Sequence, residues 1–157
     1  MEERMRIRFG MGLDGGAWPE FDCGQDARLG EVIVGPAGLI GLLETHLGLG
    51  GPETAAALRI RQYMVRMQSL SASRRFYTDS FAFDAWASAR ELLAWRDELV
   101  LYGWSPEFPD PPERFAALAE IERARDLPLA PGLADRFRAV LAALQAQPVL
   151  PIRTICL

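Results

Sequence analysis

A glycine-rich turn is the part of the chain whose residue types and spacing come closest to a ligand-binding motif: Gly35-Pro36-Ala37-Gly38-Leu39-Ile40-Gly41-Leu42. A phosphate-binding loop joins a strand to a helix so that backbone N–H groups and the positive helix end surround phosphate, with Lys and then Ser or Thr at its last two positions. Gly41 and Leu42 stand at those two positions here. The turn is therefore interpreted as a plain connection between strand and helix, as a decayed phosphate loop, or as an anion site formed by Gly35, Ala37, Gly38 and Gly41.

A second candidate is the basic and aromatic segment Arg74-Arg75-Phe76-Tyr77. An Arg side chain binds phosphate and an aromatic face stacks on a base, which are the two contacts that single-stranded nucleic acid offers. We interpret Arg74, Arg75 and Tyr77 as a nucleic-acid contact. The alternative is a loop whose aromatic side chains cover the core.

Several chemistries are excluded by composition. All 17 basic side chains are Arg, so the chain has no Lys for a phosphate loop, for a Schiff base or for the PD-(D/E)XK nuclease motif. Cys23, Cys156 and His46 lie too far apart in sequence for a structural zinc site. No nucleophile, base and orienting group can be assembled from spacing. We therefore predict no catalytic residue, no metal and no cofactor.

Length and charge balance predict one folded domain. The chain has 157 residues, 50% hydrophobic and 24% charged, with a formal net charge of -4, and a chain of this length buries enough surface to fold without disulfides. The N-terminal run MEERMRIRFG is charged and has no apolar core, so it is not a signal peptide. We expect a cytoplasmic protein with reduced thiols and no membrane partner.

The first 50 residues have the pattern of strand, turn and helix. Apolar and basic residues alternate in Met5–Met11, which predicts a strand with one apolar and one cationic face. A short apolar strand is predicted at Glu31–Val34. Helical spacing of apolar residues follows over Ala37–Leu47, and Gly48 ends that helix.

Helical hairpins are predicted from Pro52 to Gln147. Pro52 suits a first helical position, and apolar residues recur at helical spacing to about Leu70, with Arg59 and Arg66 expected on the surface. Residues 71–83 are expected to form a loop.

Three more helices follow in the pattern. Asp84 is a candidate N-cap for a long helix that ends at Gly103, with a buried stripe of Trp86, Ala89, Leu93 and Val100. Asp110 and Glu113 resemble a capping box that opens a helix over Phe115–Arg125. The last helix is predicted over Leu133–Leu144, and a strand in the tail Pro148–Leu157. Because the tail stops within an apolar strand, we expect these residues to belong to a longer protein.

Several short runs resemble the N-terminal segment of bacterial AddB-type helicase–nuclease subunits, which are PD-(D/E)XK nuclease family proteins. The resemblance spans most of residues 5–157. It rests on the runs Val34–Leu39, Leu43–Leu49, Phe76-Tyr77, Ala89–Leu99 and Pro131–Arg136.

The resemblance implies an N-terminal piece of a DNA repair and recombination exonuclease that processes broken DNA ends. It implies one α/β domain over residues 1–157, with a short parallel sheet of a degenerate, P-loop helicase-like kind and a large helical insertion at about 52–147. Its nuclease residues would lie beyond Leu157, so this segment would be non-catalytic. DNA would be a partner through the parent protein, as would a second subunit or other domains of the same chain. The alternative is a stand-alone protein-interaction domain without a nucleic-acid partner.

Overall fold

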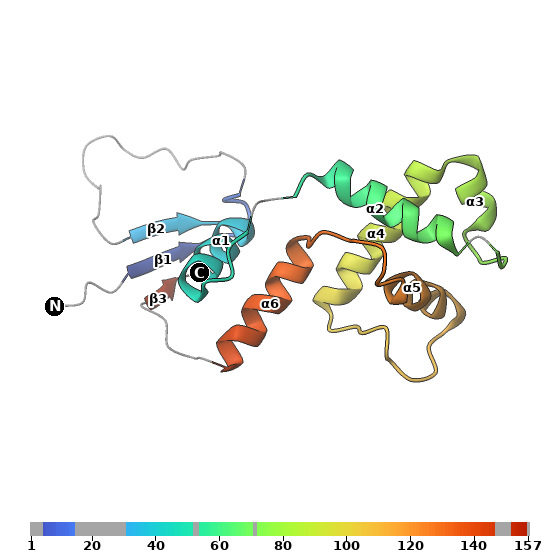
Figure 1. Ribbon diagram of the computed structural model, residues 1–157. Helices are drawn as coiled ribbons and strands as arrows, with labels where there is room; N and C mark the ends of the chain where they lie inside the picture. The colour runs from blue at the N-terminus through green and yellow to red at the C-terminus, as the bar shows by residue number, and fades with distance from the viewer. Residues whose placement is uncertain (1–4, 15–30, 52–53, 71, 147–151, 157) are drawn as a thin grey trace. The chain divides into compact units, whose positions relative to one another are not determined.

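The computed structural model describes residues 5–14, 31–51, 54–70, 72–146 and 152–156. This part of the chain is mostly helical, with six helices and a small parallel sheet (Figure 1). The chain divides into two compact units: unit 1 is Met1–Gly51 with Ala139–Leu157, and unit 2 is Pro52–Arg138. No helix within the described ranges has the length and apolar character needed to cross a bilayer.

The sheet of unit 1 is parallel and has three strands, in the order β2-β1-β3. They are β1 Met5–Phe9, β2 Glu31–Val34 and β3 Ile152–Cys156. Ile7 stands opposite Val32 on one side and Ile155 on the other, and its side chain is 1% exposed. The predicted strands, including the one in the tail, are confirmed, and β1 ends two residues earlier than expected.

Helix α1, Pro36–Leu47, follows β2 directly. Pro36 stands in the first turn, where a missing N–H costs nothing. At the other end Gly48 adopts a left-handed conformation with φ of 68° and donates to the last carbonyls, as the sequence predicted. The buried side of α1 packs with the second half of α6, Leu133–Ala146, in a small core of Ile40, Leu43 and Val140.

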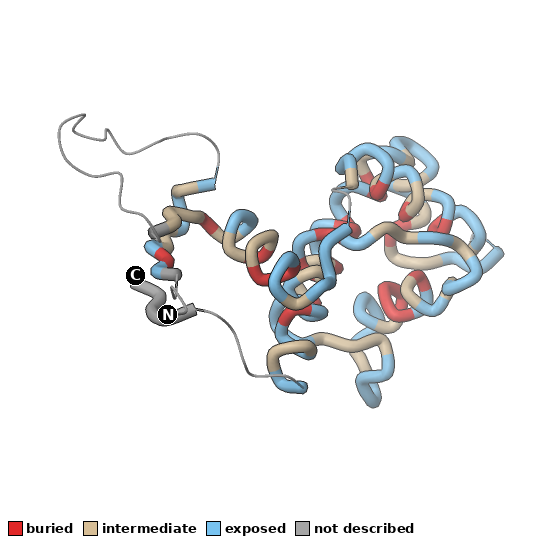
Figure 2. The backbone as a smooth tube through the Cα atoms, turned by 60° about the vertical axis from the view of Figure 1, so that its left-hand side comes forward, coloured by how far each residue is buried: buried red, intermediate tan, exposed pale blue. Residues whose placement is uncertain are grey.

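Unit 2 is built from α2 Ala56–Ser69, α3 Thr78–Phe83, α4 Ala85–Leu101, α5 Glu113–Arg123 and the start of α6. Helices α2 and α4 share the largest helix–helix contact of the unit. Buried positions recur at helical spacing along α2 and along α4. Figure 2 shows buried stretches alternating with exposed ones along the backbone. The core contains nine buried side chains: Tyr63, Met67, Tyr77, Ala89, Leu92, Leu93, Ala117, Leu118 and Ile121.

Helix boundaries in unit 2 differ from the predictions at three places. Helix α2 begins at Ala56, not at Pro52. The segment expected to be a loop contains the short helix α3. The capping box at Asp110 is wrong: α5 begins at Glu113 behind Pro112 with no side-chain cap, and Asp110 has a φ of 49°. Asp110 turns the chain instead of capping it, because Asp tolerates the left-handed region.

Burial also departs from two predictions. Arg59 and Arg66 are buried, at 9% and 7% exposure, whereas the sequence placed them on the surface. Trp86 is 43% exposed and does not belong to the buried stripe of α4. The other three members, Ala89, Leu93 and Val100, are buried as expected. The two arginines can be buried because partly buried carboxylates pair with them there.

Candidate functional site

The glycine-rich turn places its residues at the start of α1. Gly35 is the N-cap residue, Ala37 and Gly38 lie in the first turn, and Gly41 lies in the second turn, where its carbonyl accepts from the Thr45 hydroxyl at 2.8 Å. The turn thus has the strand-to-helix position that the sequence predicted. The backbone N–H groups of the first turn have no acceptor within the helix, and they point toward one position at the helix end.

That place is occupied by a carboxylate of the chain itself. Asp14, which follows β1, accepts from the N–H of Gly38 at 3.0 Å and from the N–H of Ala37. Asp14 lies so close to Gly35 that a side chain at Gly35 would collide with it. An anion is stabilised by the positive end of a helix and its unpaired N–H groups. Asp14 therefore caps the N-terminus of α1 from outside the helix, as an N-cap side chain would.

The basic and aromatic segment is divided by the structure. Arg74 is exposed and pairs with Asp79 at 2.9 Å, with 80% of its side chain open to solvent. Arg75 is held by Glu120 at 2.7 Å and by the Leu70 carbonyl. Tyr77 is 5% exposed, and burial raises the pKa of its hydroxyl. Of the three predicted residues, Arg74 alone is largely open to solvent.

Phe76, from the same segment, contacts the Trp95 ring and the Arg114 guanidinium. Its ring is nearly parallel to that of Trp95, with 7° between the planes and 6.4 Å between the centroids. The Arg114 guanidinium lies 5.7 Å from the Phe76 centroid. These contacts attach α5 and the segment before α3 to α4, which supports the alternative in which the aromatics cover the core.

Unit 2 contains a set of three buried arginines and three partly buried carboxylates, here called the charge network. It joins four helices, and its formal charges cancel. Its members are Arg59 and Arg66 of α2, Arg96 and Asp97 of α4, Glu122 of α5 and Asp135 of α6.

In the charge network each guanidinium group donates hydrogen bonds to carboxylate or backbone carbonyl oxygens. Arg59 donates to both oxygens of Asp97, at 2.7 and 3.0 Å, which is the bidentate geometry of the strongest Arg–carboxylate pairs. Arg96 is 2.6 Å from Asp135 and 3.2 Å from Glu122. Arg66 lies 3.7 Å from Glu122 and donates twice to the Leu127 carbonyl.

Ionisation in the charge network follows these contacts. Burial lowers the pKa of Arg96, but the hydrogen bond to Asp135 and the charge of Glu122 outweigh it, so the pKa of Arg96 is raised. Burial raises the pKa of Asp135, and the hydrogen bonds from Arg96 and the Gly132 N–H reverse the sign, so the pKa of Asp135 is lowered. Both groups stay charged at neutral pH.

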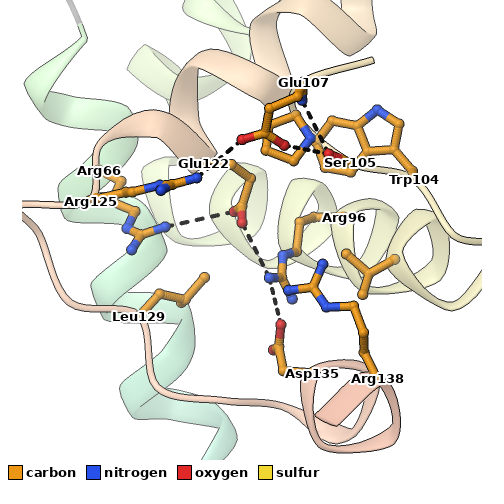
Figure 3. Close-up of a pocket in the computed structure, with 12 residues that line it drawn as sticks. Arg66, Arg96, Trp104, Ser105, Glu107, Glu122, Arg125, Leu129, Asp135 and Arg138 are labelled. Atoms are coloured by element: carbon orange, nitrogen blue, oxygen red, sulfur yellow. Dashed lines mark hydrogen bonds and ion pairs between the residues drawn. The ribbon is translucent and has the colours of Figure 1, made fainter. Parts of the chain in front are cut away.

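A cavity of about 330 Å³ adjoins the charge network. One wall is the chain of ion pairs from Arg66 through Glu122 and Arg96 to Asp135 (Figure 3). The segment Trp104–Glu107 and the side chains of Arg125 and Arg138 form other parts of the lining. Within the described residues of unit 2, the lining of this cavity consists mainly of charged and polar side chains.

Sequence reasoning missed the charge network and the cavity. One signal was present: Arg59, Tyr63 and Arg66 are spaced four and three apart, so both arginines share the helix side of a core tyrosine. Arg96 likewise stands four residues after Leu92 and four before Val100 in the buried stripe of α4. A charged residue within an apolar stripe indicates a buried partner, although the sequence does not say which carboxylate.

Within the described ranges, no group of three or more His, Cys, Asp or Glu side chains is arranged to hold a metal ion. Cys23 lies outside the described residues. Comparison of the chain with family models, with curated proteins and with solved structures found no match.

Proposed function

We propose that the chain is a non-catalytic, helicase-like segment of a DNA repair and recombination exonuclease. In this proposal unit 1 is a degenerate P-loop fold that serves as a scaffold for other parts of the protein. The observation that supports it most is the carboxylate of Asp14 at the N-terminus of α1. A segment that keeps the strand, turn and helix of a phosphate loop while its own carboxylate fills the anion position is a scaffold, not a nucleotide hydrolase.

Electrostatics and composition support this assignment. A phosphate approaching Ala37 and Gly38 would meet a like charge at hydrogen-bond distance and would find no Lys to neutralise it. The parent activity, and the contact with DNA, follow from the resemblance of the short sequence runs to helicase–nuclease subunits.

The gene itself provides the first test. The proposal expects the reading frame to continue for several hundred residues beyond codon 157 and to reach an acidic cluster with a Lys in a strand. A stop codon directly after Leu157 would remove the parent exonuclease and overturn the proposal.

Hydrolysis of ATP by the 157-residue chain provides the second test. We expect no turnover above background from the wild type or from Asp14→Ala, because removal of the carboxylate restores neither the Lys nor the hydroxyl ligand of magnesium. Turnover by the wild type that is abolished in a Gly38→Val variant would show a working loop and contradict the scaffold assignment.

The DNA contact of the proposal is tested at Arg74, the exposed member of its segment. In the parent protein, Arg74→Ala is expected to weaken DNA binding and to reduce the slope of log affinity against log salt by about 0.7–0.9, which is the value for a single phosphate. Unchanged affinity and slope would show that Arg74 does not bind DNA. Arg75→Ala is a poorer test, since Arg75 holds Glu120 and its removal disturbs the fold.

A second candidate function is a self-sufficient protein-interaction domain. Two large side chains near the ends of α3 and α4 favour it: Phe83 is 95% exposed and Tyr102 is 83% exposed. Exposed aromatic residues are common anchors of protein interfaces. Sedimentation of the wild type and of the variants Phe83→Ser and Tyr102→Ser tests this candidate. A wild-type chain that sediments as a monomer, with a distribution that neither substitution changes, would count against it.

A further inference from the structure

Helix α6 belongs to both compact units. It runs without interruption over Leu133–Ala146, and the division between unit 2 and unit 1 falls inside it, between Arg138 and Ala139 (Figure 1). Its first half is therefore part of the unit that contains the charge network, and its second half is part of the unit that contains the glycine-rich turn. Different kinds of contact hold the two halves.

Charge holds the first half of α6 in unit 2. The Asp135 carboxylate lies 2.6 Å from the Arg96 guanidinium (Figure 3) and 3.5 Å from that of Arg59. It also accepts from the Gly132 N–H at 2.9 Å, just before the helix begins. The chain packs closely at this point, because a side chain at Gly132 would collide with the Arg59 guanidinium. Asp135 thus joins the start of α6 to α2 and α4.

Apolar burial holds this first half only weakly. Leu133 and Phe137 are 42% and 46% exposed, and Ala134 is the one apolar side chain that is buried among residues 133–138. Burial of the single methyl group of an Ala stabilises a helix far less than burial of a Leu or Phe side chain. The ionic contacts of Asp135 are therefore the main attachment of this half to unit 2.

The second half of α6 completes the small core of unit 1. Val140 is 2% exposed and packs with Ile40 and Leu43 of α1, and Leu144 packs against the same group. The stretch 139–146 is too short to form a stable helix by itself, since isolated helices of fewer than about 12–15 residues are marginal in water and their first turn is the costly one. The preceding turns, which Asp135 holds in unit 2, supply that nucleus.

We propose that α6 couples the two units, so that the stability of the unit 1 core depends on the attachment of Asp135 to the charge network. When that attachment breaks, α6 loses its nucleus, the core of unit 1 loses Val140, and α1 with the glycine-rich turn at its start opens more often. A change confined to unit 2 would thus act on the glycine-rich turn through α6. This coupling goes beyond the proposed function and does not depend on it, because it uses only the contacts of α6.

Amide hydrogen exchange of the 157-residue chain, followed by mass spectrometry, tests the coupling. Asp135→Asn keeps the shape of the side chain and removes its charge. We expect the amides of α1 to exchange at least about tenfold faster than in the wild type, because α6 loses its ionic attachment. The matched control is Asp97→Asn, which removes the same charge from the network at α4. It should speed exchange in α2 and α4 and leave α1 near its wild-type rate.

A break at the unit boundary tests the same link without replacing a residue of either core. Ala139 is exposed, and a proline in the interior of a helix interrupts it. Ala139→Pro should speed exchange of α1 and leave α2 and α4 near their wild-type rates. The double variant with Asp135→Asn should exchange at α1 no faster than Ala139→Pro alone, because the link is already broken.

Three results would overturn the proposal. The first is wild-type exchange of α1 in Asp135→Asn, or in Ala139→Pro if Asp135→Asn does not fold. The second is equal acceleration at α1 in Asp97→Asn and Asp135→Asn, which would mean that α1 responds to the overall stability of unit 2. The third is an additive effect at α1 in the double variant, which would mean that Asp135 acts on unit 1 by a route other than α6.

Discussion

Replacing Arg96 by Met separates a buried charge network from ordinary packing. Met keeps an unbranched apolar stem and removes the guanidinium, so that Glu122 and Asp135, whose side chains are 11% and 16% exposed, lose their shared cation. Removing one member of a buried ion pair costs about 3–5 kcal/mol. Here Arg66 still faces Glu122 at 3.7 Å and Arg59 faces Asp135 at 3.5 Å, so we expect the lower end, about 3 kcal/mol.

Urea unfolding followed by tryptophan fluorescence measures this cost. With a slope of about 1.5–2 kcal/mol per molar urea, the midpoint of Arg96→Met is expected about 1.5–2 M below that of the wild type. The control is Arg74→Met, which removes an ion pair whose side chains are 80% and 81% exposed. An exposed pair is worth less than about 1 kcal/mol, so the control midpoint should move little.

Acid distinguishes the electrostatic cost from the packing cost. In Arg96→Met, Asp135 loses the hydrogen bond and the charge of Arg96 that lower its pKa, so its carboxylate is protonated at a higher pH than in the wild type and its charge is then removed. The difference in unfolding free energy between wild type and Arg96→Met should therefore shrink as the pH is lowered. A loss no greater than that of Arg74→Met, or a large loss that is the same at every pH, would refute the reasoning.

Three further results are expected. Asp14→Ala should lower the free energy of unfolding of unit 1 by about 1 kcal/mol in chemical unfolding, because two N–H groups of α1 lose their acceptor, and an unchanged value would show that solvent replaces it. The lowered pKa of Asp135 stabilises the folded state at pH values above its ordinary pKa of 3.8, and this contribution disappears as the pH falls through the lower folded-state pKa. Acid unfolding of Asp135→Asn should accordingly lack that component, and identical pH profiles would contradict it. Tyr63→Phe should leave the melting temperature unchanged or higher, since the buried Tyr63 hydroxyl has no partner among the described residues, whereas a fall of several degrees would reveal one.

Elements set by short-range interactions were predictable. Asp84 accepts from the Ala87 N–H at 2.9 Å and opens α4 as the sequence predicted, because a capping bond joins residues only three apart. The end of α1 at Gly48 is of the same kind, since the left-handed conformation suits a residue without a side chain. Strand β3 lies within the tail Pro148–Leu157, where the sequence predicted a strand, although Arg153 and Thr154 interrupt strict alternation of apolar and polar residues.

Predictions that depended on which side of a helix is covered were less secure. Trp86 has the spacing of the buried stripe of α4, yet it stands at the start of the helix and is 43% exposed. Helix α3 escaped prediction because six residues are too few to display a helical period. In each case the missing information is the position of a neighbouring element, which spacing within the segment does not contain.

The candidate sites depended on tertiary contacts to an even greater degree. The sequence located the glycine-rich turn, but the carboxylate that fills it comes from Asp14, 24 residues before Gly38. Tyr77 is of a residue type that stacks on bases, but its side chain is part of the core. The position of Tyr77 next to Arg74 and Arg75 in sequence suggested a nucleic-acid contact. Its side chain is buried and is therefore not accessible to a base.

The sequence alone determined the absence of Lys, the strand, turn and helix of unit 1, and the helical character of the middle of the chain. These features depend only on composition and on contacts between residues that are close in sequence. Only the tertiary structure decided where charge is buried. Arg59 donates to the Ala130 carbonyl 71 residues away, and Arg96 meets Glu122 from another helix. A guanidinium is stable in the interior only when carboxylates and carbonyls from several elements surround it, and that arrangement exists only in the folded chain.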